Sequence, residues 1–421
     1  MMENLKSGRH GDGQAGIGVA RSAIGVGAVV VAVSPAWSFV GALGLALVTQ
    51  LGLSNVDIGI AAGVASAGYV VMALPLGHWL DRVGDKWFLM GTPFIMGALF
   101  CTTAVVGTFT AFLILAFTGG GVWAGATTTL NRYVALVAPT HLMGRALGLT
   151  QASIMVAGAL GAFALPWISL EHGWRTAVYD LAIISCLFGA VSVWAFHGRN
   201  VVVVSARPQK SRRGAWRLVG RNRLTPHLVA LVAFGVVMGV AMNCTWTFML
   251  PYLATIGGFE GAKASVGLAL MFVCAAIGRF VAGLATDRIL STWWLLTLSA
   301  MTAAVCFVLL ATLIQGLGVL LIVANLGIFF FGQNTPYLVA GLGLMPSSGW
   351  GFAAAILTMA HVVGGVIGPP MFALVVDRTG GYGMAWFTLA VVSLVSLVAL
   401  FFAHPRRTYN SHGEAHRSEV E

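Results

Sequence analysis

Long apolar runs recur along the whole of this 421-residue chain. Each run holds roughly 18 to 25 residues, which is enough for a helix to cross about 30 Å of hydrocarbon. Only 9% of the residues are charged and 58% are hydrophobic, whereas a soluble protein of this size needs far more charged surface. The sequence therefore predicts an all-α membrane protein. We expect twelve transmembrane helices, at 22–48, 56–78, 87–107, 110–135, 147–168, 174–196, 226–250, 263–285, 293–314, 318–340, 350–375 and 384–403.

The chain repeats a short motif at half its length. Gly77-His78-Trp79-Leu80-Asp81-Arg82 and Gly283-Leu284-Ala285-Thr286-Asp287-Arg288 each close an apolar run and lie 283 − 77 = 206 residues apart. Internal repeats of this length are typical of membrane proteins built as two bundles in tandem. We therefore expect a six-helix bundle at 22–196 and another at 226–403, with a linker at 197–225 and tails at 1–21 and 404–421.

The distribution of Lys and Arg predicts the orientation in the membrane. The interval from His197 to Arg223 carries eight basic residues and no acidic one, and such loops stay in the cytoplasm. With both termini inside, 19 of the 23 basic residues are cytoplasmic and only Arg175, Lys263 and Arg378 lie outside. We expect a multi-pass protein of the plasma (inner) membrane. This bias also explains the net charge of +10 without a nucleic-acid partner.

Residues typical of enzymes or cofactor sites are not apparent in the sequence. It contains no paired acid and base at matching depth and no Gly-x-x-x-x-Gly-Lys-[Ser/Thr] phosphate loop. The five cysteines lack the paired spacing of a disulfide framework or a metal site. We expect no cofactor, no metal and no enzymatic activity, and we interpret the cysteines as packing residues: Cys101, Cys186, Cys244, Cys274 and Cys306.

Several motifs resemble the major facilitator superfamily. The loop from Gly77 to Lys86 resembles its cytoplasmic signature after the second helix, and Gly283 to Arg288 resembles the degenerate copy after the eighth. Further similar segments are Gly144-Arg145-Ala146-Leu147-Gly148, Gly173-Trp174-Arg175 and Gly365-Val366-Ile367-Gly368-Pro369-Pro370. The resemblance covers nearly the whole chain and implies a secondary transporter that works by alternating access of two six-helix halves, usually as a monomer. It implies a cytoplasmic gate formed by Gly77, Asp81, Arg82, Gly84, Lys86, Gly283, Asp287 and Arg288.

Two departures from superfamily patterns narrow the function. Where many proton-driven members carry an arginine in the fourth span, this chain has Ala116-Phe117-Thr118, so we do not expect coupling through that site. The fifth span reads Gly158-Ala159-Leu160-Gly161 and lacks the Gly-Pro step of many drug antiporters. This weakens an assignment to drug efflux.

Two basic residues in the predicted spans are candidates for substrate binding, because an ionisable side chain at the bilayer centre costs at least about 2.5–3.5 kcal/mol. Arg279 lies eight residues before Asp287, about 12 Å into the membrane at 1.5 Å per residue. His361 lies eleven residues beyond Trp350, which places it about 16 Å deep. In the superfamily, spans eight and eleven flank the central cavity, where two basic groups would favour an anion.

The sequence around Arg279 suggests the class of anion. Gly278-Arg279-Phe280-Val281-Ala282-Gly283 resembles the eighth helix of monocarboxylate transporters and oxalate/formate antiporters, whose arginine holds the substrate carboxylate. His361 stands where the oxalate/formate group has a lysine. Because histidine is either neutral at pH 7 or a proton carrier, the pattern favours a monocarboxylate over a dicarboxylate, with proton coupling left open. Neutral residues that could complete the site are Asn243, Trp246, Gln333, Asn334, Tyr69 and Trp37.

Other interpretations of these residues remain open. Arg279 could pair with Asp287, His361 could be a packed helix residue, and Asp180 is interpreted as an interfacial partner of Arg175. A transporter of the same fold that exports hydrophobic drugs or metabolites through an aromatic and Met-rich pocket is the main alternative function. A receptor or a membrane-embedded enzyme is the third.

Overall fold

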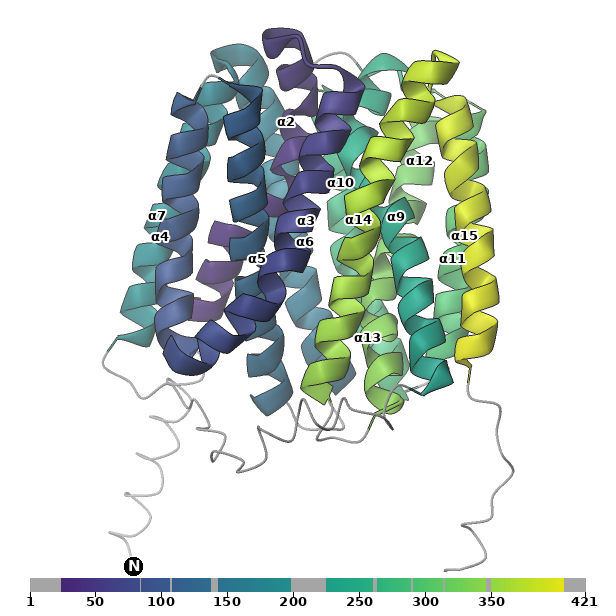
Figure 1. Ribbon diagram of the computed structural model, residues 1–421. Coiled ribbons are helices and arrows are strands. Elements are labelled where there is room, and N and C mark those ends of the chain that lie inside the picture. Colours follow the sequence, from purple (N-terminus) through teal and green to yellow (C-terminus); the bar gives the residue numbers. More distant parts are fainter. Residues whose placement is uncertain are drawn as a thin grey trace, which may run out of the picture.

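The computed structural model describes residues 24–83, 85–106, 108–137, 143–197, 225–259, 263–288, 291–312, 315–345 and 350–404. Within these ranges the chain is helical and contains no β-strand. The helices stand side by side across one bundle (Figure 1). The helices that begin at Ile24 and end at Ala403 have these residues at the same end of the bundle, which we call the termini end. We call the opposite end the far end.

Twelve membrane crossings are present in the described ranges. Eleven helical segments are long and apolar enough to cross a membrane, and a short helix Ile24–Val33 together with α2 makes the remaining crossing. The first half contains α2 (Pro35–Leu51), α3 (Asn55–Val83), α4 (Asp85–Val105), α5 (Phe109–Val137), α6 (Met143–His172) and α7 (Trp174–Phe196). The predicted twelve-helix fold of two six-helix bundles is confirmed.

The second half repeats this arrangement with one irregular crossing. Its regular helices are α9 (Pro226–Thr255), α10 (Lys263–Arg288), α11 (Thr292–Ala311), α14 (Trp350–Thr379) and α15 (Gly383–Ala403). The tenth crossing is composed of α12 (Leu317–Asn325), the π-helical turn η2 (Leu326–Phe330), the 3-10 turn η3 (Phe331–Gln333) and α13 (Asn334–Gly343). Such turns change the backbone hydrogen-bonding pattern in the middle of a helix.

Two of the three prolines expected at bends lie at or near a break in a helix. Pro35 begins α2 directly after Ser34, which separates α2 from the preceding short helix. Pro336 follows the π and 3-10 turns by three residues. A proline fixes its own φ and lacks an N–H to donate, so both positions suit a break. Pro251 lies inside α9, which continues to Thr255.

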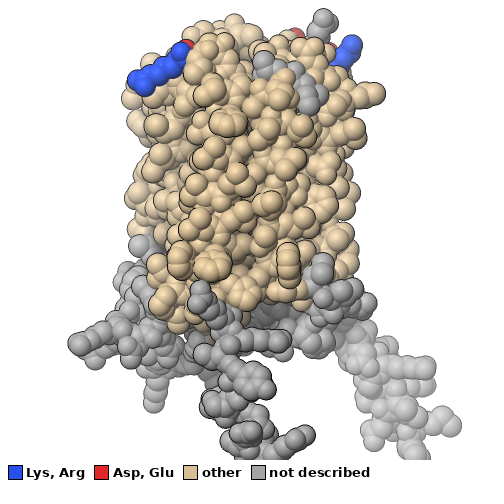
Figure 2. Space-filling view, turned by 90° about the vertical axis from the view of Figure 1, so that its right-hand side faces the viewer, with Lys and Arg blue, Asp and Glu red and all other residues tan. Residues whose placement is uncertain are grey.

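The outer surface of the bundle is apolar. Figure 2 shows one face on which the described Lys, Arg, Asp and Glu residues lie near the upper edge, above a broad uncharged band. Large hydrophobic side chains are exposed on this kind of surface, including Trp294 at 71% and Leu321 at 68%. A soluble protein would bury such residues, whereas lipid solvates them. The chain is therefore a multi-pass membrane protein.

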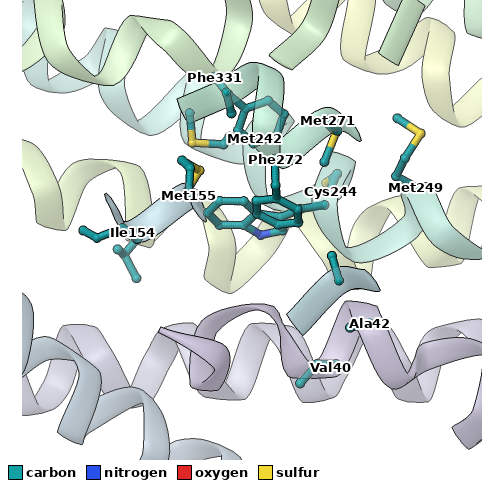
Figure 3. Packing of buried hydrophobic residues seen from close by; sticks show 14 of the residues in the cluster. Val40, Ala42, Ile154, Met155, Met242, Cys244, Met249, Met271, Phe272 and Phe331 are labelled. Carbon is teal, nitrogen blue, oxygen red and sulfur yellow. The ribbon is translucent and has the colours of Figure 1, made fainter. Parts of the chain in front are cut away.

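The two halves are joined by helix pairs that pack closely. α6 packs along α10, α3 along α14, and α2 against α9. Glycines permit this approach: a Cβ added at Gly41 would lie 2.5 Å from Trp246 O, and one added at Gly59 would lie 2.6 Å from Pro369 O. Figure 3 shows labelled side chains from both halves in one region of the core, with α2 and α6 contributing Val40, Ala42, Ile154 and Met155.

The far end carries a polar contact between the halves. Asn55 Nδ2 at the start of α3 donates to Asp377 Oδ1 near the end of α14, at 3.2 Å. Asp57 accepts hydrogen bonds from the backbone N–H and hydroxyl of Ser54, and its own N–H donates to that hydroxyl. This is a capping box, which agrees with the cap-like role expected for Asp57.

Most of the predicted gate motif lies outside the described side chains. Gly84 is not described, and neither are the side chains of Asp81, Arg82, Asp287 and Arg288. Gly283 is described: a Cβ added at Gly148 of α6 would lie 3.3 Å from the Cα of Gly283. This glycine therefore lies at a contact between the halves. The linker and both tails lie mostly outside the described ranges, so the domain boundaries stay predictions, as does the gate.

Candidate functional site

Arg279 is buried inside the bundle, with 3% of its surface exposed. Its Nε donates to Phe331 O at 3.1 Å. Its Nη1 donates to the side-chain oxygen of Gln151 at 3.0 Å and lies 3.4 Å from the backbone oxygen of the same residue. All three acceptors are uncharged oxygens. The charge of this guanidinium is therefore solvated by the protein but not neutralised by these partners.

The local sequence explains why a backbone carbonyl is available to Arg279. Gly278 packs so closely against the tenth crossing that an added Cβ would run into Ile328 O. Gly332 packs against Gly278 in return, with an added Cβ 3.1 Å from its carbonyl carbon. Phe331 begins η3, directly after the π turn, where the regular α-helical hydrogen bonds are interrupted. Its carbonyl accepts the Arg279 bond there.

Gln151 connects Arg279 to Asn334 and belongs to the other half. Asn334 Nδ2 donates to Gln151 Oε1 at 2.9 Å, so this single oxygen accepts from both residues. Chemistry fixes the amide orientations: arginine only donates, so the Gln151 atom facing it is the oxygen, and Asn334 must then present its NH2 group. Two donors on α10 and α13 thus converge on one acceptor of α6, which is itself 6% exposed.

No described carboxylate lies in this part of the core. Asp57, Glu171, Asp180 and Asp377 belong to the far-end portions of α3, α6, α7 and α14. The alternative pairing of Arg279 with Asp287 concerns a side chain outside the description. The second amino group of the guanidinium, Nη2, has no hydrogen-bond partner among the described residues. Two of the five N–H donors of arginine therefore remain unused.

An aromatic group lies next to this network. The ring of Trp246 stacks against Phe272, with centroids 6.3 Å apart, and packs against Phe331 at 5.7 Å. Phe331 is also the residue whose carbonyl binds Arg279. Figure 3 shows Phe272 and Phe331 close to Met155 and Met242. The site thus combines one cation with an apolar wall, which suits a small solute that has a charged end and an apolar end.

His361 lies in a second polar group within the C-terminal half. The residue is 6% exposed, and neither ring nitrogen has a hydrogen-bond partner among the described residues. Its ring packs edge-on against Tyr337, with centroids 4.4 Å apart. Gln333 is also buried, with both side-chain amide atoms unpartnered. Asn243 donates to the backbone oxygens of Gly239 and His361, so it connects α9 to α14.

These contacts decide the family question together with a match along the sequence. The family model of the Major Facilitator Superfamily matches residues 25–349, which include both halves and the α6–α10 contact. The chain belongs to the Major Facilitator Superfamily. It is a membrane transporter and not an enzyme, and the resemblance found in its motifs is confirmed.

Two superfamily relatives have printed substrates. The "Probable sulfoacetate transporter SauU" of Cupriavidus necator is 26% identical over 87% of this chain and 89% of its own length. The "Probable galactarate/D-glucarate transporter GudP" of Escherichia coli is 21% identical over 85% of this chain and 86% of its own. Among solved structures, a bacterial homologue of the lysosomal transporter Spinster superposes with a TM-score of 0.70 at 14% identity, covering 93% of this chain and 96% of its own. That likeness shows the fold.

The remaining candidates lie apart from the Arg279 network or beyond the description. The Tyr69 hydroxyl is 2.9 Å from the Thr127 hydroxyl, within the first half. The side chain of Trp37 is not described. Arg175 Nε donates to Ala104 O, and no ion pair joins it to Asp180, so the expected pairing of these two residues is wrong.

Gln151 is the site residue that sequence reasoning missed. It is a neutral amide, and we weighed chiefly ionisable groups in the spans. Depth along the helices could have identified it: Gln151 lies eight residues after Met143, where α6 begins at the termini end, and Arg279 lies nine residues before Arg288, where α10 ends at that same end. Equal depth on two neighbouring helices indicates that the two side chains can meet.

A separate groove of about 560 Å³ lies between α11 and α12. It is lined by residues such as Met301, Val305 and Leu321, two of which are among the exposed large hydrophobics. Because it opens on the apolar outer surface, it is a lipid-facing groove and not part of the Arg279 network.

Proposed function

We propose that this superfamily member moves a small organic anion, a monocarboxylate, across the membrane by alternating access, and that Arg279 holds the carboxylate. The observation that carries this proposal is the guanidinium in the core whose partners are all neutral. A buried cation without a counter-ion is unfavourable unless a ligand supplies the negative charge. A carboxylate fits the planar guanidinium through two parallel hydrogen bonds.

The remaining candidates would hold the rest of the solute. Asn334 adds a donor beside Arg279, and Trp246 adds an aromatic face for an apolar tail. His361, Gln333, Asn243, Tyr69 and Trp37 are proposed as further contacts on the path of the solute. Two relatives carry the names of organic-anion transporters, which supports the anion class and leaves the number of carboxylates to experiment.

We also propose that the termini end is cytoplasmic and that the membrane is the plasma (inner) membrane. The described Arg175, Lys263 and Arg378 lie at the starts of α7 and α10 and near the end of α14, all at the far end. Most other basic residues belong to segments that the positive-inside rule retains in the cytoplasm. Fusing a periplasm-sensitive reporter to the C-terminus tests this orientation, and reporter activity outside the cytoplasm would overturn it.

The central experiment tests Arg279. Purified protein is screened by thermal shift against acetate, L-lactate, pyruvate, benzoate, sulfoacetate and tartrate, and compounds that stabilise it are tested for counterflow in proteoliposomes. Arg279→Ala should weaken binding of a stabilising monocarboxylate by at least about 100-fold, because it removes a charge-assisted bidentate contact. Arg279→Lys should recover only part of the affinity, because lysine lacks the planar fork.

The matched control is Lys263→Ala, which removes an exposed positive charge at the start of the same helix. Its binding and transport should stay at the level of the unmodified protein. Membrane expression and thermal unfolding are recorded for each variant, so that misfolding is not mistaken for lost binding. Undiminished monocarboxylate transport by Arg279→Ala would remove the anion site, and transport of hydrophobic cations by that variant would favour the efflux alternative.

A further inference from the structure

Gln151 Oε1 occupies a position that suits a carboxylate oxygen. It accepts from Arg279 Nη1 at 3.0 Å and from Asn334 Nδ2 at 2.9 Å. One donor is charged and the other is neutral, and both belong to the second half of the molecule. An ionised oxygen accepts such bonds more strongly than a neutral amide oxygen does. Gln151 is therefore the weaker type of acceptor for this donor pair.

The guanidinium also has room in its hydrogen-bonding for a second oxygen. Nη2 has no hydrogen-bond partner among the described residues. A carboxylate that replaced the Gln151 amide would place one oxygen between Nη1 and Asn334 and present the other to Nη2. Nε would keep its bond to Phe331 O, so the arginine would not need to move away from its backbone anchor.

We propose that Gln151 is an internal competitor for the carboxylate of the substrate, and that binding transfers the donor pair of Arg279 and Asn334 from Gln151 to the solute. This inference rests on the proposed function, because it assumes an anionic substrate at Arg279. It assigns Gln151 a role in specificity: the amide fills the anion position in the empty protein, and only a solute with a stronger acceptor displaces it.

The exchange also connects binding to the contact between the halves. Gln151 lies on α6 and its two donors lie on α10 and α13, so both hydrogen bonds cross from one half to the other. Gly148, one turn earlier on α6, packs against the Arg279 backbone, with an added Cβ 3.0 Å from Arg279 O. Displacing the Gln151 amide removes the polar part of this contact and leaves the glycine packing, which lowers the free energy needed to separate the halves at this depth.

The test uses acetate as the probe and three variants of the full-length protein. Gln151→Leu removes the competing oxygen at similar volume and should tighten acetate binding by about 10-fold, the worth of a hydrogen bond to a charged group. Gln151→Glu places a tethered carboxylate on the guanidinium and should weaken acetate binding by at least about 10-fold. Ser153→Ala is the control on the same helix, because the Ser153 hydroxyl bonds within α6, and it should leave the affinity unchanged.

The sign of the Gln151→Leu effect separates the possibilities. A residue that simply contacts the substrate would weaken binding when replaced by leucine, and a structural residue would change stability alone, so either result overturns the competitor role. If Gln151→Leu does not fold, Gln151→Glu decides, and unchanged acetate affinity in that variant overturns the proposal. Acetate binding that survives Arg279→Ala refutes the proposed function itself, whereas binding lost in Arg279→Ala but not tightened in Gln151→Leu refutes only the competitor role.

Discussion

At the scale of single residues, the buried guanidinium of Arg279 is held by three oxygens that carry no charge. Transfer of a charged group out of water costs several kcal/mol even after the protein relaxes around it. Hydrogen bonds to Phe331 O and to Gln151 offset part of this cost. The rest is a standing free-energy advantage for any anion that reaches the site, and this is why we place the carboxylate there.

His361 is the residue through which proton coupling is tested. Both of its ring nitrogens lack partners among the described residues, so the ring is open to a proton or to a substrate oxygen. Glutamine keeps a polar side chain of similar reach but cannot carry a proton. In His361→Gln we expect uptake driven by a pH gradient to fall at least about 10-fold while counterflow continues. Proteoliposome uptake with and without the gradient measures this.

The same vesicles supply the control for His361. Counterflow needs a working binding site but no net proton movement, so it reports that the variant is folded and binds substrate. Equal gradient-driven uptake in His361→Gln and in the unmodified protein would exclude His361 as the proton carrier. Loss of both activities would instead place His361 among the residues that bind substrate.

At the scale of elements, glycines decide how closely helices from the two halves approach. In α2, a Cβ added at Gly41 would lie 2.5 Å from Trp246 O, but one added at Gly44 would lie 3.7 Å or more from its neighbours. The two positions are on one helix, three residues apart, and both lie at the contact with the second half or near it. Small residues at such contacts are the usual means of packing helices in lipid.

Gly41→Ala and Gly44→Ala form a matched pair for this contact. Gly41→Ala should destabilise the protein by about 1–3 kcal/mol, because a backbone oxygen cannot move aside as a flexible side chain can. Gly44→Ala should be close to neutral, since its added methyl makes ordinary contacts. Thermal unfolding of the two detergent-solubilised variants measures the difference. Equal unfolding temperatures would show that α2 and α9 are not packed this closely.

At the scale of the whole molecule, transport requires the halves to separate at one end and then at the other. The far end is held by the hydrogen bond between Asn55 and Asp377 and by the close packing of α3 on α14. Deeper in the bundle, Gln151 holds α6 to α10 and α13. The two polar contacts lie at different depths, which is the arrangement that alternating access needs.

A crosslink at the far end tests this movement. In a background without the exposed Cys101 and Cys186, Asn55→Cys and Asp377→Cys are combined and joined by a short, reducible bis-thiol reagent. Counterflow should fall by at least about 10-fold on crosslinking and return on reduction, because the far end can no longer open. Each single-cysteine variant, treated in the same way, is the control. Full counterflow in the crosslinked protein would show that the far end need not separate.

Much of the architecture could be predicted, because lipid imposes a simple rule. Each crossing must satisfy its own backbone hydrogen bonds and present apolar side chains, so the twelve apolar runs correspond closely to the observed crossings. Local irregularities were less predictable. Pro35 and Pro336 marked two breaks, but the π and 3-10 turns at Leu326–Gln333 arise from packing against Gly278 and have no clear signature in the sequence.

The candidate site divides in the same way. Arg279 and Asn334 stood out because a polar side chain in a membrane span is costly and rare, and that cost is a property of the sequence alone. The partner of both residues did not stand out, because Gln151 lies about 130 positions earlier and its importance depends on which helix α10 packs against. Composition and periodicity determined that this protein crosses the membrane twelve times with a cation in its second half. Only tertiary packing, through glycines that bring α6 against α10, decided that a neutral amide from the first half holds that cation.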